Sequence, residues 1–153
     1  MRDGPSGLFY EDLEVGMSFT TKGRTVTEAD IVNFAGISGD YNQLHLNEEY
    51  AKETQFKKRI AHGLLGLTIS SGLTQQMDLY NDTLIAFLGL TWTFKGPVFI
   101  GDTVHVAQSI KEKRETRKPG RGIVVFESKL INQRGETVQE GERTIMIKMK
   151  SAE

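Results

Sequence analysis

The spacing of apolar residues changes once along the chain, after Asn81, and this change limits the possible folds. Segment 61–77 carries Leu and Ile on every side of a helical turn, which predicts a long, largely buried helix. The following segments are rich in Val, Ile, Thr and Phe and partly alternate, as strands do: 84–94, 103–115, 123–131 and 137–148. Turn residues separate these segments. The pattern predicts an α+β domain in which an antiparallel meander curls around one helix.

The N-terminal part predicts shorter elements. Segment 17–24 is a candidate strand, and Thr27 is a candidate N-cap of a helix that ends at Gly36 and Gly39. The next stretch, SGDYNQLH from Ser38 to His45, is expected to be a loop, with one further helical turn over residues 47–52.

Length and charge exclude several classes of protein. A chain of 153 residues is expected to form a single domain over 1–153, with residues 1–7 flexible. The net charge of -1 gives no electrostatic basis for binding nucleic acid or an anionic membrane. Cysteine is absent, which removes disulfides and thiol nucleophiles and fits a reducing compartment. With no apolar N-terminal run and no spanning segment, we expect a cytoplasmic protein.

Two of the three histidines lie in one short stretch, together with an aspartate and an asparagine. Asp40 and His45 are close enough to reach a single water molecule, and both side chains can carry a proton. Such a pair suits the addition of water to an activated double bond, or its reverse. The alternative is that Asp40 and Asn42 only form a turn and His45 lies on the surface.

His62 and Gly63 stand at the expected start of the long helix. Backbone N–H groups there lack intrahelical partners, and glycine lets a ligand approach closely. Gly63 is therefore a candidate donor to a carbonyl oxygen that gains charge during a reaction. The alternative is that close packing requires a small residue there. The spacing of Asp40, His45 and His62 matches no common metal motif, so no metal is expected.

The segment FAGISGDYNQLHLNEEYAKETQFKKRIAHGLLG resembles the hydratase signature of the MaoC-like family, which includes (R)-specific enoyl-CoA hydratases. The later stretch FKGPVFIGDT is similar to a second element of the same family, so the resemblance covers most of the chain. The family adopts the hot-dog fold, in which a curved antiparallel sheet wraps a long central helix. Its members usually pair as dimers.

The resemblance implies a role for each matching residue. Asp40 and His45 correspond to the catalytic pair, and Gly63 to the glycine whose N–H polarises a thioester carbonyl. Supporting positions near the substrate or the catalytic pair are Asn42, which orders the loop, His62, and Ser71, which would hydrogen-bond near the aspartate. One departure is Gln43, where the family usually has proline, whose fixed φ would preorganise the loop.

The resulting expectation is an (R)-specific enoyl-CoA hydratase that adds water to trans-2-enoyl thioesters. It needs no cofactor, takes an acyl-CoA or acyl carrier protein thioester, and forms a homodimer or a dimer of dimers. Alternatives are a dehydratase of a branched or dicarboxylic acyl-CoA, a thioesterase, and a non-catalytic acyl-binding protein. Thioesterases of the hot-dog fold usually have a catalytic acid on the central helix. Segment 61–77 contains no Asp or Glu, so a thioesterase is disfavoured. The basic run 111–121 is read as a solvated hairpin tip, or as a contact for coenzyme A phosphates.

Overall fold

The strands of the second half form one curved antiparallel sheet. The computed structural model describes residues 7–150, and the sheet in it has the order β1-β4-β5-β6-β3, with the short β2 also paired to β4. The long strands are β3 (Leu84–Phe94), β4 (Thr103–Glu115), β5 (Arg121–Ile131) and β6 (Thr137–Lys148). The strands β1 (Ser18–Thr20) and β2 (Arg24–Thr25) replace the single strand predicted over 17–24.

The order of the strands corrects the predicted meander. Strands β4, β5 and β6 do follow one another through hairpins, but β3 pairs with β6 and not with its sequence neighbour β4. The link between β3 and β4 is not a tight turn. It crosses the end of the sheet and forms a bridge between Phe99 and Ile60. An alternating pattern defines the two faces of a strand, but it does not define the neighbouring strand.

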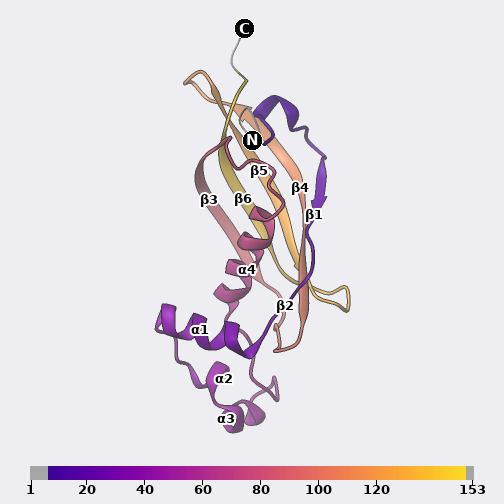
Figure 1. Ribbon diagram of the computed structural model, residues 1–153. Helices are drawn as coiled ribbons and strands as arrows, with labels where there is room; N and C mark the ends of the chain where they lie inside the picture. The colour runs from indigo at the N-terminus through magenta and orange to yellow at the C-terminus, as the bar shows by residue number, and fades with distance from the viewer. Residues whose placement is uncertain (1–6, 151–153) are drawn as a thin grey trace, which may run out of the picture.

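The helix α4 (Gly63–Gln75) lies along the inner face of this sheet, as Figure 1 shows. Leu65, Ile69 and Leu73 recur every fourth residue and pack into a core with Val104, Val106, Leu130 and Val138 of the strands. The predicted burial holds on the side of the helix that faces the sheet, whereas Leu64 on the outer face is 59% exposed in the single chain. The sheet covers only one side of the helix.

The segment before α4 forms three helices that gather at one end of the sheet (Figure 1): α1 (Glu28–Ser38), α2 (Gln43–Leu46) and α3 (Glu48–Glu53). Thr27 caps α1, accepting a hydrogen bond from the N–H of Asp30. Gly36 lies inside α1, and Gly39 ends it with a φ of 75°, a conformation that favours glycine. The predicted loop over SGDYNQLH is wrong for its last residues, since His45 lies on α2.

The basic β4–β5 hairpin tip lies at the opposite end of the sheet from α1, α2 and α3 (Figure 1). Within one chain, this position favours the solvated tip over a contact with a ligand near Asp40. The predicted flexibility of residues 1–7 falls almost wholly outside the described residues. Among the helices of residues 7–150, none is both long enough and apolar enough to cross a membrane.

Candidate active site

Asp40 and His45 are held by local hydrogen bonds on either side of the start of α2. The carboxylate of Asp40 accepts from the N–H of Asn42 at 3.2 Å, and Asn42 in turn caps α2 by accepting from the N–H of Leu44 at 2.9 Å. The Nδ1–H of His45 donates to the carbonyl oxygen of Ile60 at 2.8 Å. A carbonyl oxygen only accepts, so this bond places the proton on Nδ1 and leaves Nε2 of the neutral ring as a base.

His62 connects the start of α4 to the same loop. Its Nε2–H donates to the backbone carbonyl of Asp40 at 2.9 Å, and its ring stacks on His45 with centroids 3.8 Å apart. Phe34 of α1 packs on its other side, at 4.9 Å between ring centroids. His62 is only 3% exposed, so it acts as a buried support for the main chain of Asp40.

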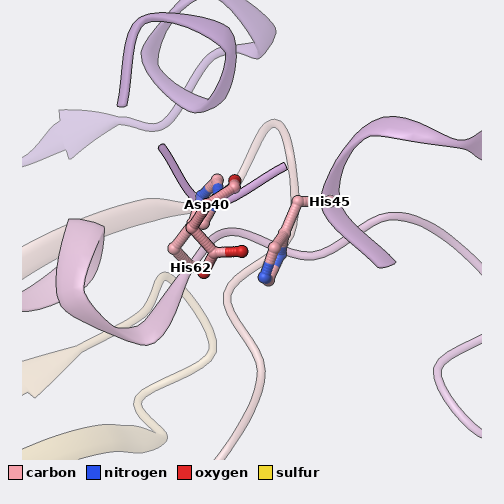
Figure 2. Close-up of side chains that lie close together, drawn as sticks. All are labelled: Asp40, His45 and His62. Carbon is pink, nitrogen blue, oxygen red and sulfur yellow. The ribbon is translucent and has the colours of Figure 1, made fainter. Parts of the chain in front are cut away.

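The three side chains lie close together, as Figure 2 shows. One polar atom from each of Asp40, His45 and His62 lies within 4.8 Å of the others. A water molecule makes hydrogen bonds of about 2.8 Å, so it can span a gap of this size. Asp40 is exposed whereas the two histidines are buried, and the pair therefore stands where a water molecule can enter from solvent.

Asp40, His45 and His62 are residue types that bind transition metals, but the orientation of the two rings does not suit an ion. The planes of the two imidazoles differ by only 27°. Because imidazole lone pairs lie in the ring plane, the lone pairs of two stacked rings lie in separate, nearly parallel planes and do not meet at one point. Tetrahedral coordination needs lone pairs that converge. The arrangement therefore suits proton transfer through water better than a shared metal ion.

Burial lowers the pKa of His45 from its ordinary value of 6.5, and the neighbouring His62 lowers it further. The hydrogen bond to Ile60 and the charge of Asp40 act in the opposite direction but do not outweigh these effects. His45 is therefore neutral at physiological pH, with its Nε2 lone pair available to accept a proton.

Gly63 is the first residue of α4, and His62 at the N-cap makes no side-chain hydrogen bond to the first turn. The N–H of Leu65 donates to the carbonyl of His62 at 3.0 Å, whereas the N–H groups of Gly63 and Leu64 have no intrahelical acceptor and lie at the positive end of the helix dipole. A Cβ at Gly63 would lie 2.9 Å from the ring of Phe94. This close approach supports the packing reading of the glycine, and the donor role stays a prediction.

A cavity of about 340 Å³ adjoins Gly63. The residues that line it are Phe56, Ile60, Ala61, Gly63, Phe94, Lys95, Gly96, Pro97, Val98 and Gln139. Asp40 and His45 do not line this cavity but contact the 60–63 segment of its wall, since His45 bonds to Ile60 and the main chain of Asp40 bonds to His62. The cavity and the Asp40–His45 pair are thus neighbours that share the segment before α4.

Other predicted positions fall at different distances from this centre. Ser71 is exposed on α4, eight residues beyond Gly63, which corresponds to about 12 Å along a helix. It lines a second cavity and is not brought together with Asp40 in the single chain.

Gln43 is the first residue of α2, where proline is favoured because its N–H needs no partner. Here the Gln43 side chain instead accepts from Asn47 at 2.8 Å, which ties the short helix together.

Two supporting residues were not predicted from the sequence. Gln139 of β6 donates to the carbonyl of Gly63 at 3.0 Å and accepts from Trp92 at 2.8 Å. Arg59 pairs with Glu28 of α1 and Glu48 of α3, both at 2.7 Å, which holds the N-terminal helices beside the start of α4. No local pattern marks either residue, because their partners are distant in sequence.

With the geometry established, comparison with known proteins identifies the family. A model of the MaoC-like domain matches residues 12–130. The chain belongs to the MaoC-like domain family. An (R)-specific enoyl-CoA hydratase of Rhodospirillum rubrum is 36% identical over 140 residues, which is 91% of each chain. A 3-hydroxybutyryl-CoA dehydratase of Methylorubrum extorquens is 40% identical over 116 residues, covering 72% of this chain and 71% of its own. Both relatives of this MaoC-like chain are hydro-lyases by name.

Solved structures place the MaoC-like chain in the hot-dog fold. The crystal structure of a monoamine oxidase regulatory protein from Archaeoglobus aligns with a TM-score of 0.89 and 35% identity, covering 95% of this chain and 97% of the other. A Mycobacterium tuberculosis protein with a double hot-dog fold aligns with a TM-score of 0.81, covering 96% of this chain and 46% of its own. At 21% identity, that likeness shows the fold alone. The α+β prediction and the hot-dog fold are confirmed.

Proposed function

We propose that this MaoC-like protein is an (R)-specific enoyl-CoA hydratase, which reversibly adds water to trans-2-enoyl thioesters to give (R)-3-hydroxyacyl thioesters. The observation that carries the proposal is the convergence of Asp40 and the neutral His45 within the span of one water molecule. Two proton-carrying groups on one water match the demands of hydration, in which one proton is removed and another is delivered.

We propose a step for each group. A conjugated thioester is electrophilic at C3, and negative charge moves onto its carbonyl oxygen when water attacks. The Gly63 N–H at the start of α4 donates to that oxygen. The Asp40–His45 pair takes a proton from the attacking water and returns a proton to C2. The same groups run the reverse dehydration, and the chemistry needs no cofactor.

The named activities of the relatives support this proposal from both directions, since one is a hydratase and the other a dehydratase. The cavity beside Gly63 is lined mainly by apolar side chains, which fits an acyl group or the pantetheine arm of a carrier. Lys95 stands at this cavity, and Lys58 lines an adjoining one. These cations can meet the phosphates of coenzyme A or the acidic surface of an acyl carrier protein.

The active unit that we propose is a homodimer, or a dimer of such dimers, working in the cytoplasm. Strand β3 is a sheet edge, and its exposed apolar side chains include Phe87 at 58% and Phe94 at 51%. Leu64 on the outer face of α4 adds to the same apolar surface. A sheet edge beside an exposed apolar face is a typical surface for association with a second copy of the chain. The absence of cysteine supports the reducing compartment.

The proposal is tested with purified protein and a panel of enoyl-CoA thioesters, following loss of the conjugated absorbance and assigning the configuration of the product. We expect (R)-3-hydroxyacyl-CoA. Release of free coenzyme A without hydroxyacyl product would indicate a thioesterase, and no reaction would indicate a binding protein.

The matched variant is Asp40→Asn, which keeps the size of the side chain and its acceptor oxygen for the N–H of Asn42. We expect at least a 100-fold loss in kcat, because general acid–base catalysis typically contributes that much or more. The melting temperature should stay within about 2 °C, since Asp40 is exposed and a surface change costs little stability. Near-normal turnover in this variant would exclude Asp40 from the chemistry.

A further inference from the structure

A second cavity, of about 150 Å³, lies beside the C-terminal half of α4, away from Gly63. Apolar side chains form part of its wall, and Arg143 and Gln108 bring polar groups to it. The volume is similar to that of cavities that hold a molecule of the size of benzene. The proposed hydration does not use these two polar residues.

Arg143 is a buried cation that pairs with no carboxylate of residues 7–150. It is 6% exposed and donates to Ser70 at 2.6 Å and to Thr74 at 3.1 Å, while its guanidinium lies 5.5 Å from the ring centroid of Trp92. Within residues 7–150, the charge interaction of Arg143 is with Tyr80 and involves no acid. Burying an unpaired charge is costly, and a guanidinium has five N–H donors, so donors remain for an anion.

Gln108 of β4 is the second unusual group. It is 3% exposed, and neither its amide nitrogen nor its amide oxygen has a hydrogen-bond partner within residues 7–150. Ser128 lies directly opposite on β5, and its hydroxyl is also buried without a partner there. Buried polar groups are nearly always satisfied, so the free amide of Gln108 beside the cavity is a place where a polar ligand or a water molecule can bind.

We propose that this cavity binds a carboxylate group attached to a short apolar stem. The guanidinium of Arg143 matches a carboxylate in shape and charge, and the amide N–H of Gln108 supplies a further donor. The apolar wall, which includes Leu84 and Ile145, fits the stem. A cation is disfavoured because the site already contains one.

Helix α4 and strand β3 of a second copy would not supply this carboxylate. The exposed apolar surface beside the cavity belongs to α4 and β3, and neither 63–75 nor 84–94 contains Asp or Glu. Dimerisation through these two elements would cover the cavity with apolar or neutral residues. A small carboxylate therefore remains the better match for Arg143.

The carboxylate has two chemical sources. One is the far end of a dicarboxylic enoyl thioester, a source that rests on the proposed hydratase function. The other is a free carboxylic acid that binds independently of turnover. Both present the same group to Arg143 and Gln108, and the experiment separates them.

The first arm measures binding of sodium propionate to the full-length protein by calorimetry and by the shift in melting temperature. Propionamide, which has the same stem without the charge, and sodium chloride at equal ionic strength are the controls. We expect saturable binding of propionate alone, weakened at least 10-fold by Arg143→Met. Gln108→Leu, which replaces an unpaired amide with an apolar group of similar size, should weaken binding even if Arg143→Met does not fold.

The second arm compares two enoyl-CoA thioesters of equal length, one ending in a methyl group and one in a carboxylate. For each protein, kcat/KM for the acidic thioester is divided by kcat/KM for the neutral one. If this ratio falls at least 10-fold in either variant, the thioester is the source of the carboxylate. Propionate binding without such a fall identifies a free acid. The proposal would be overturned if propionate raised the melting temperature no more than chloride does and the kcat/KM ratio stayed unchanged in both variants. Propionate binding in a protein that hydrates no thioester would overturn only the hydratase function.

Discussion

At the scale of single residues, the site depends on how few groups hold Asp40 and His45 in place. His45 is oriented by the carbonyl of Ile60, and the main chain of Asp40 is held by His62. The stacking of the two imidazoles at 3.8 Å has an electrostatic effect, because two positive rings at that separation repel each other. Proton transfer at this site therefore relies on one charged imidazole at most.

The lowered pKa of His45 predicts the pH dependence of activity and stability. Because neutral His45 is the competent base, kcat/KM should be flat at neutral pH and fall on the acid side with a midpoint below 6.5. In the folded state the neutral form is favoured, so below pH 6.5 the unfolded chain binds more protons than the folded one. The free energy of unfolding should therefore decrease as the pH falls from 6.5 through the lowered pKa of His45.

Kinetics between pH 5 and 8 test the pH dependence of kcat/KM, and urea unfolding at pH 5 and 7 tests the pH dependence of stability. His45→Gln is the control, since it lacks the titrating group and should lose less stability between the two pH values. An acid limb centred above 6.5 would contradict the proposed environment of His45.

The motif residues were predictable at this scale because they lie within a few residues of one another, and Asp40, Asn42 and His45 do come together. Ser71 shows the limit of such reasoning, since a position in a motif does not tell how far along the helix axis a side chain lies. The buried support from His62 to the main chain of Asp40 also has no local sequence signal, because it joins residues 22 apart.

At the scale of elements, the start of α4 is fixed to the sheet by one buried amide. Gln139 of β6 is 2% exposed and joins the carbonyl of Gly63 to the indole of Trp92 on β3. A Cβ at Gly66 would lie 2.2 Å from the Gln139 amide, so the helix needs glycine to approach this closely. Three elements therefore meet at the point where the thioester carbonyl is proposed to bind.

Gln139→Leu removes both hydrogen bonds and leaves the Trp92 N–H without its partner. We expect a loss of about 1–3 kcal/mol in the free energy of unfolding, the usual cost of an unsatisfied buried group. We also expect a reduced kcat, because the first turn of α4 loses a restraint. Urea denaturation measures the stability, with Gln76→Leu at the exposed end of α4 as the matched control. Equal free energies of unfolding for the two variants would show that the hydrogen bonds of Gln139 contribute nothing to stability.

The bounds of β3, β4 and β6 were predicted as observed, because long alternating runs bounded by Gly and Pro have few other solutions. The partner of β3 was not predictable from the same signals. Pairing depends on which apolar face the whole sheet can bury, and that is decided by contacts between residues distant in sequence.

At the scale of the whole molecule, the apolar surface over β3 and the outer face of α4 predicts self-association. Phe87→Glu places a charge on this surface and should convert the proposed dimer to monomers, as measured by analytical ultracentrifugation. Val15→Glu is a suitable control, since Val15 is also exposed, at 63%, but lies on neither α4 nor β3. A wild-type protein that sediments as a monomer at micromolar concentration would contradict the prediction.

The position of β6 between β5 and β3 has a consequence for how the protein acquires its structure. Strand β3 leaves the ribosome well before β6, yet it has no neighbour in the sheet until β6 arrives. Until then, the apolar sides of α4 and β3 stay open to water and to other nascent chains. Closing so long a loop is slow, and partly built sheets aggregate. The chain is therefore expected to mature in one late cooperative step after synthesis, and to depend on chaperones most strongly just before it.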